Sequence, residues 1–214
     1  MSEEKPPEEN LASRQIVHIV DDDAETRENL AGLVRQAGFV PSLYASGEDF
    51  LAQTPDRESA CILLDYHMQG LDGLDTLSAM QQRNISIPTI MMNGGDNVPL
   101  AVEAMRRGAF DFIEKPHLAA ALQVSLRRAS ERSKEMHEKE EVRTRAADTI
   151  ATLTPRERDV FDLLILGRST KEIARALDLS PRTVDVYRAG IYQKTGTSGI
   201  AELVRLAFRA GILD

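Results

Sequence analysis

The sequence is poor in cysteine and contains no long apolar run. Its single cysteine, Cys61, cannot form an intramolecular disulfide, and its place in the apolar run ACILL indicates that it packs as a small hydrophobic side chain. No apolar run approaches the roughly 20 residues that a membrane-spanning helix needs. The N-terminal stretch MSEEKPPEEN is acidic and contains proline, whereas a signal peptide is basic and then apolar. We therefore expect a cytoplasmic protein that has no membrane partner.

Aromatic residues are also scarce, at 5%, but hydrophobic residues make up 42% of the chain and suffice for a buried core. A length of 214 residues suits two smaller domains. Residues 14–116 carry 8 basic and 16 acidic side chains, whereas residues 152–214 carry 10 and 8. This asymmetry suggests a cation site in the first part and a weakly basic surface in the second, although so small a basic excess does not by itself indicate nucleic-acid binding.

Short apolar runs alternate with amphipathic stretches from Ile16 onward, a pattern typical of β/α repeats around a parallel sheet. The fold class predicted for this part is α/β, with a doubly wound five-stranded parallel sheet. The predicted strands are residues 16–20, 40–44, 61–64, 88–92 and 111–114.

The second half of the chain has a helical pattern. Residues 118–150 contain neither glycine nor proline and predict one long helix, and polar residues interrupt its heptad seam, which favours a solvated helix over a continuous coiled coil. Thr154, Ser169 and Ser180 then provide three successive helix starts, predicting an all-α four-helix unit with a tight turn between its second and third helices. The expected parts are a disordered N-terminal tail (1–14), an α/β domain (15–130), a helical linker (131–151) and an all-α domain (152–214).

Charged residues follow three of the predicted strands. Asp21, Asp22 and Asp23 end the first, Asp65 ends the third, and Lys115 follows the fifth. Because the carboxyl ends of parallel strands meet at one edge of a sheet, these side chains are expected to lie together. Each residue alone has an ordinary alternative role, as a helix cap, a loop residue or a solvated lysine. Together they predict a phosphate-handling site in which crowded carboxylates bind Mg²⁺.

The stretches VHIVDDDAETRENL, LLDYHMQGLDG and GAFDFIEKP resemble the receiver domain of two-component response regulators, which has a flavodoxin-like fold. The resemblance implies that Asp65 accepts a phosphoryl group from a partner sensor histidine kinase. It implies that Asp21, Asp22, Asp65 and the backbone carbonyl of His67 hold Mg²⁺. By the same resemblance, Lys115 binds the phosphoryl group and Phe112 is an aromatic residue that changes rotamer on activation.

Three positions depart from the receiver pattern. Gln69 stands where proline commonly follows methionine, which removes a φ restraint. His117 stands where phenylalanine often follows Lys-Pro, and Asn93 replaces a threonine or serine. We expect Asn93 to face Asp65 and to alter the coupling between phosphorylation and Phe112. The following Gly94-Gly95 also suits a turn with positive φ.

The segment from Leu153 to Ile212, with LTPRE, KEIA and SPRTVDVYR, resembles the LuxR-type helix-turn-helix. With the receiver, it makes the whole chain similar to the FixJ subfamily of response regulators. Residues 182–194 are predicted to form the helix that reads the major groove of double-stranded DNA. Asp185, Val186 and Ala189 are assigned to base edges, Arg182, Thr183, Tyr187, Lys194 and Lys171 mostly to phosphates, and Arg188 to either.

These features predict a phosphorylation-controlled transcription factor, not an enzyme, that forms a homodimer on promoter DNA and has RNA polymerase as a candidate partner. One alternative is a regulator whose receiver no longer depends on phosphate, which only Asn93 favours. Another is a Mg²⁺-dependent phosphatase of the haloacid dehalogenase type, but His67 occupies the position of the second aspartate that it needs. A dinucleotide-binding enzyme is disfavoured because no G-x-G-x-x-G follows the first strand.

Overall fold

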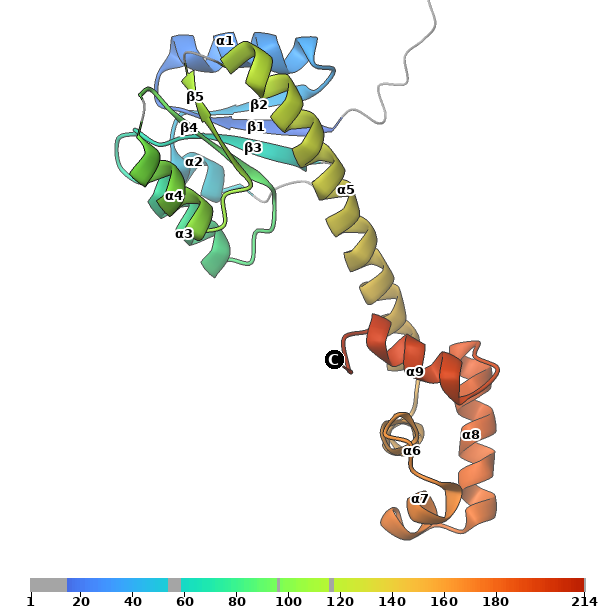
Figure 1. Cartoon of the computed structure of the whole chain (residues 1–214). Helices are drawn as coiled ribbons and strands as arrows, with labels where there is room; N and C mark the ends of the chain where they lie inside the picture. The colour runs from blue at the N-terminus through green and yellow to red at the C-terminus, as the bar shows by residue number, and fades with distance from the viewer. Residues whose placement is uncertain (1–14, 54–58, 96, 116–117, 214) are drawn as a thin grey trace, which may run out of the picture. The chain divides into compact units, whose positions relative to one another are not determined.

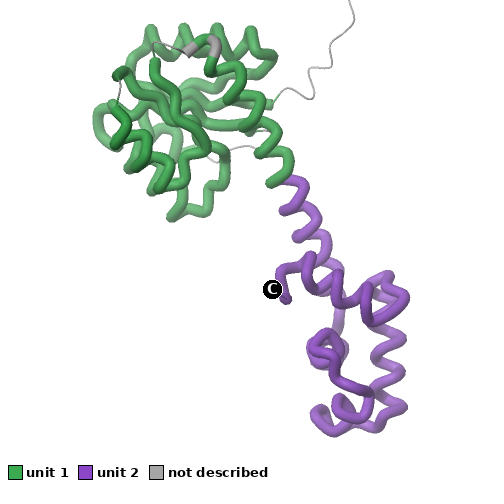
Figure 2. Tube along the Cα trace, in the orientation of Figure 1, with its two compact units in different colours: residues 1–136 green, residues 137–214 purple. Residues whose placement is uncertain are grey.

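The computed structural model describes residues 15–53, 59–95, 97–115 and 118–213. The chain forms two compact units that divide after Met136 (Figure 2). The predicted disordered tail and His117 lie outside the described residues. One helix, α5 (Leu118–Ala151), begins in the first unit and continues into the second (Figure 1).

The first unit contains the predicted parallel five-stranded sheet, in the order β2-β1-β3-β4-β5. The bounds of two strands differ from those predicted: β3 begins before Cys61 and ends one residue later, and β4 begins and ends one residue later. The residues of β3 and β4 are buried at every position, so no alternation of apolar and polar residues marks where these strands end. The strands are β1 (Ile16–Val20), β2 (Val40–Tyr44), β3 (Ser59–Asp65), β4 (Thr89–Asn93) and β5 (Asp111–Glu114).

Helices cover both faces of this sheet (Figure 1), as a doubly wound fold requires. On one face α1 and the start of α5 bury Leu30, Val34 and Leu126 against the strands. On the other face α2, α3 and α4 contribute Phe50, Met80 and other apolar side chains to a second core. The helices are α1 (Ala24–Gln36), α2 (Gly47–Leu51), α3 (Gly73–Gln82) and α4 (Val98–Arg106).

The second unit is all α-helical, with a core that includes Val160, Phe161 and Ile191. The helix starts predicted at Thr154 and Ser169 are present as capping boxes, in which each side chain and the glutamate three residues later hydrogen-bond the backbone reciprocally. Within the described residues, no helix is both long and apolar enough to cross a bilayer. After α5, the four helices are α6 (Pro155–Ile165), α7 (Thr170–Ala176), α8 (Pro181–Thr195) and α9 (Ile200–Arg209).

Candidate functional site

Three carboxylates meet at the carboxyl edge of the sheet. The neighbouring strands β1 and β3 pair Val20 with Leu64, so the next residues, Asp21 and Asp65, emerge side by side. Asp21 is fully buried and Asp65 is 3% exposed, whereas Asp22 is exposed. One oxygen of each of the three carboxylates lies within 4.8 Å of the others. The sequence prediction that these acids converge therefore agrees with the geometry.

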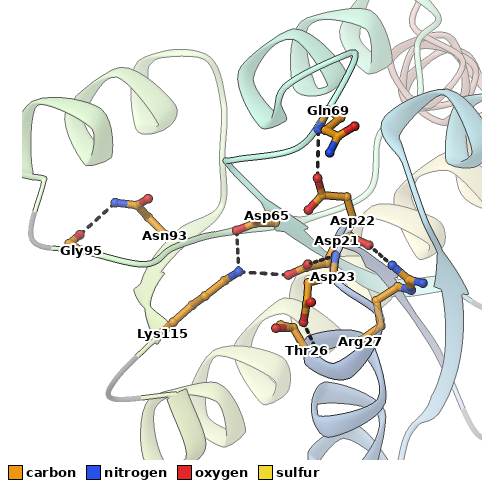
Figure 3. Close-up of polar contacts among 10 residues, drawn as sticks. All are labelled: Asp21, Asp22, Asp23, Thr26, Arg27, Asp65, Gln69, Asn93, Gly95 and Lys115. Atoms are coloured by element: carbon orange, nitrogen blue, oxygen red, sulfur yellow. Dashed lines mark hydrogen bonds and ion pairs between the residues drawn. The ribbon is translucent and has the colours of Figure 1, made fainter.

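Lys115 reaches the same carboxylates from the end of β5 (Figure 3). Its Nζ lies 2.9 Å from Asp65 Oδ1 and 3.1 Å from Asp21 Oδ2, and the lysine side chain is 29% exposed. β4 separates β3 from β5 in the sheet, so the long side chain spans the end of an intervening strand. An ammonium group thus bridges two buried acids that would otherwise repel each other.

Burial and neighbouring charge shift the pKa values of Asp65 and Lys115 in opposite directions. Burial raises the pKa of the Asp65 carboxyl above its ordinary value, although the ammonium of Lys115 partly offsets that rise. Burial would lower the pKa of Lys115, but its hydrogen bonds to Asp65 and Asp21 outweigh burial and raise that pKa. Lys115 therefore remains positively charged at neutral pH and supplies fixed positive charge next to Asp65.

Backbone groups orient the two acids of the β1–α1 loop. The Asp23 N–H donates to Asp21 Oδ1 at 2.9 Å, and Arg27 Nη1 donates to the Asp21 carbonyl oxygen at 2.6 Å. The Gln69 N–H donates to Asp22 Oδ2 at 3.1 Å (Figure 3). The sequence pattern predicts only the loss of a φ restraint at position 69. The N–H donor, which glutamine has and proline lacks, has no such signature.

Asn93 is the last residue of β4 and is 3% exposed. Its Nδ2 donates to the Gly95 carbonyl oxygen at 2.8 Å, and Figure 3 shows the carboxamide turned toward Gly95. The carboxamide donor is therefore directed at the Gly95 carbonyl, and an altered coupling between phosphorylation and Phe112 stays a prediction. The prediction of positive φ was wrong for Gly94 and Gly95, since neither has φ in the left-handed region. Phe112, in β5, is half-buried and packs against the core on the α4 side of the sheet.

In the second unit, α8 presents a mixed surface. Val186 is 67% exposed and so presents an apolar side chain to solvent from this helix. Tyr187 packs partly against the core of the unit. Of the remaining predicted DNA-contact residues, Arg182, Asp185, Ala189, Lys194 and Lys171 are exposed, and Thr183 and Arg188 are half-buried.

Two of the cations on α8 also have partners within the unit. Arg188 donates from Nη1 to Thr170 Oγ1 at 2.9 Å and lies 3.6 Å from an Asp185 oxygen. Lys194 Nζ lies 2.6 Å from Glu157 Oε2. Lys194 and the capping hydrogen bonds of α6 together lower the pKa of Glu157 to about 2. Glu157 thus largely balances the charge of Lys194 inside the unit. Sequence spacing alone does not reveal this ion pair.

Two protein-family models match the chain. The response regulator receiver domain matches residues 17–127, and the luxR family of bacterial regulatory proteins matches residues 151–207. These ranges contain the carboxylate cluster and the helices α6 to α8, respectively.

The similarity to known proteins extends over nearly the whole chain. The chain is 41% identical to the transcriptional regulatory protein FixJ of Bradyrhizobium diazoefficiens, over 95% of this chain and 100% of that protein. The solved response regulator StyR is 30% identical and covers 92% of this chain and 99% of its own, with a TM-score of 0.76. Full-length FixJ from B. japonicum is 39% identical with a TM-score of 0.55, over 94% of this chain and 100% of its own.

Proposed function

This chain belongs to the FixJ-like two-component response regulators, which regulate transcription, and we propose that a phosphoryl group on Asp65 controls its binding to DNA. The observation that carries the proposal is the position of Lys115, whose Nζ bridges Asp65 and Asp21. A receiver domain implies a histidine kinase partner, and a LuxR-type domain implies DNA binding. The presence of the acids and of Lys115 gives no support to a phosphate-independent receiver.

Asp65 is the nucleophile in the proposed transfer. One of its carboxylate oxygens attacks the phosphorus of a phosphohistidine on the kinase, an O–P bond forms, and the breaking N–P bond returns its electron pair to the imidazole. Lys115 stabilises the negative charge of the phosphoryl oxygens as the group arrives. Accepting and losing this group is the only chemistry that we assign to the chain.

The donor set at this edge fits Mg²⁺. Asp21, Asp22 and Asp65 offer hard carboxylate oxygens, which Mg²⁺ prefers, and the exposure of Asp22 leaves room for water ligands. We include the backbone carbonyl of His67, two residues beyond Asp65, as a further ligand. When bound, Mg²⁺ would supply positive charge to the crowded carboxylates and the phosphoryl oxygens. The residues of the chain that we expect to position the acids for it are Asp23 and Gln69, through their backbone N–H groups.

The output surface of the receiver is proposed to lie on α4 and β5. Val98, Val102 and Met105 of α4 are 66%, 48% and 49% exposed, an unusual density of apolar side chains on one short helix. They line a shallow groove together with Phe112 and Glu114 of β5. We propose that phosphorylated receivers pair through this face to form a homodimer, which places two DNA-binding units on a two-fold related promoter site.

The DNA-binding part of the proposal rests on α7 and α8. The turn between them passes through Asp178 with φ of 53°, a conformation that aspartate tolerates better than most residues. We propose that α8 enters the major groove, with Asp185, Val186 and Ala189 toward base edges. The phosphate contacts are assigned to Lys171, Arg182, Thr183 and Tyr187, while Arg188 is oriented by Asp185 and Lys194 stays paired with Glu157.

The remaining assignments concern the setting of the protein. We propose a cytoplasmic location, because the DNA and the kinase domain that it requires are found there, and RNA polymerase is a candidate contact at the promoter. We also propose the boundaries 15–130 for the receiver, 131–151 for the linker and 152–214 for the DNA-binding domain.

The test is an electrophoretic mobility shift with promoter DNA, with and without acetyl phosphate and Mg²⁺. We expect the phosphoryl donor to strengthen binding by the wild type and to leave Asp65→Asn unchanged, because the amide lacks a nucleophilic carboxylate. The proposal fails if untreated Asp65→Asn binds DNA as tightly as the phosphorylated wild type. Circular dichroism of the variant controls for folding.

A further inference from the structure

A glutamate of α2 holds the loop that joins β3 to α3. Glu48, in the first turn of α2, accepts a hydrogen bond through Oε1 from the Leu71 N–H at 3.0 Å. The same loop contains Gln69, whose N–H donates to Asp22 Oδ2 at 3.1 Å. Two backbone donors of this loop, two residues apart, therefore meet carboxylates that come from two other parts of the first unit.

Gly70 lies between these two donors and makes the approach of Glu48 possible. Its φ of 81° is in the left-handed region, where a residue with a Cβ is strained. A Cβ at this position would also lie 2.6 Å from Glu48 Oε1 and would push the carboxylate away from the Leu71 N–H. The conformation of the loop and its contact with Glu48 thus depend on the same glycine.

The helix that carries Glu48 is fixed to the core of the first unit. Phe50 of α2 is 1% exposed and packs in the core on that face of the sheet. Gly47 lies so close to α3 that an added Cβ would be 2.1 Å from Thr76 Oγ1. The exposed side chain of Glu48 therefore extends from a backbone that has little freedom to move.

Glu48 is ionised in this contact, because hydrogen bonds from its own backbone N–H and from that of Leu71 lower the pKa of its carboxyl. Hydrogen bonds to an ionised acceptor are stronger than those between neutral groups. The loop that they hold also contains His67, whose carbonyl we include among the Mg²⁺ ligands. A loop that samples other conformations would bind Mg²⁺ more weakly, in proportion to the fraction of molecules in the binding geometry.

We propose that Glu48 is a positioning residue for the Mg²⁺ site, which acts through the β3–α3 loop and not as a ligand. By fixing the Leu71 N–H, it holds the loop in the conformation that places the Gln69 N–H on Asp22. The inference rests on the proposed function, because the Mg²⁺ site is part of it.

The first experiment measures the affinity of the full chain for Mg²⁺ by isothermal titration calorimetry, without a phosphoryl donor. Glu48→Ala removes the acceptor and should weaken Mg²⁺ binding by about threefold to tenfold, the effect of one hydrogen bond. Glu48→Gln keeps a side-chain oxygen that can accept from Leu71, so it should bind Mg²⁺ more tightly than Glu48→Ala. Asp49→Ala is the matched control, because it removes the same charge from the next exposed residue of α2, and it should match the wild type.

A second measurement follows the loop in the metal-free protein. Solvent exchange of the Leu71 and Gln69 amide protons, measured by NMR, should be faster in Glu48→Ala than in the wild type. Faster exchange at Gln69 is the informative result, because the loss of one local hydrogen bond would affect Leu71 alone.

Three results overturn the positioning role. They are an unchanged affinity of Glu48→Ala for Mg²⁺, an equal loss of affinity in Asp49→Ala or Glu48→Gln, and unchanged exchange at Gln69. The proposed function has a different failure, namely that acetyl phosphate with Mg²⁺ leaves the binding of DNA by the wild type unchanged.

Discussion

Lys194 is a basic residue on the proposed DNA-reading helix that we expect to contribute to stability and not to phosphate binding. Its Nζ lies 2.6 Å from Glu157 Oε2, and Glu157 is only 8% exposed. A lysine already paired with a mostly buried carboxylate offers a DNA phosphate less net positive charge than an unpaired lysine does. Lys171 is exposed on α7 and provides the matched comparison.

The magnitude follows from the titration of Glu157. A pKa of about 2, against an ordinary value of 4.5, corresponds to roughly 3 kcal/mol if it were all realised as stability. Part of this shift comes from the Thr154 capping hydrogen bonds, and solvent screens the pair because the Lys194 side chain is 39% exposed. We therefore expect the pair with Lys194 to contribute about 1 kcal/mol. The pKa is lowered in the folded state, so this stabilisation is complete above pH 4.5 and is lost as the pH falls toward 2.

Two assays separate the roles of the lysines. Lys194→Met should lower the free energy of unfolding of the second unit at pH 7, measured by hydrogen exchange of α6 and α8, and this loss should shrink below pH 4.5. It should leave the salt dependence of DNA binding unchanged, whereas Lys171→Met should reduce the slope of log K against log salt by about 1. An equal reduction in slope for both variants, or a ¹³C titration of Glu157 near 4.5, would refute the reasoning.

Two further substitutions test how the receiver site is held. Gln69→Pro removes the N–H that donates to Asp22 at 3.1 Å, so the affinity for Mg²⁺ should fall by about threefold to tenfold in isothermal calorimetry. An unchanged affinity would show that this donor does not position Asp22. Gly73→Ala places a Cβ 2.5 Å from the Asp65 carbonyl oxygen and 2.9 Å from Met91 Sδ. We therefore expect the free energy of unfolding of the first unit, measured in urea, to fall by about 1–3 kcal/mol. An unchanged free energy of unfolding would mean that α3 shifts freely away from β3.

Two kinds of feature in this fold can be predicted from the sequence: those set by local residue spacing and those set by position at the end of a strand. Parallel strands end at a common edge, so the meeting of Asp21, Asp65 and Lys115 could be predicted without knowing any distance. Capping at Thr154 and Ser169 was equally predictable, because the partners lie three residues apart and the contact is local.

The features that sequence reasoning missed depend on rotamers and on contacts between distant segments. The Gln69 N–H meets Asp22 across 47 positions of sequence, and Lys194 meets Glu157 across 37. Neither pairing has a periodic signature. The Asn93 carboxamide is oriented by the backbone carbonyl of Gly95. Because every residue has a backbone carbonyl, residue types alone do not predict that the carboxamide turns toward Gly95.

The resting contacts of Lys115 bear on which residue distinguishes the two states of the receiver. Its Nζ already lies 2.9 Å from Asp65 and 3.1 Å from Asp21, so a phosphoryl group on Asp65 would exchange one anionic partner for another. An exchange between anions changes the energy of the lysine less than a new ion pair would. On our prediction that Asn93 donates to a phosphoryl group on Asp65, its carboxamide would exchange the neutral Gly95 carbonyl for a charged acceptor, and hydrogen bonds to charged groups are the stronger. The difference between resting and active conformations should therefore depend more on Asn93 than on Lys115, although the lysine carries the charge.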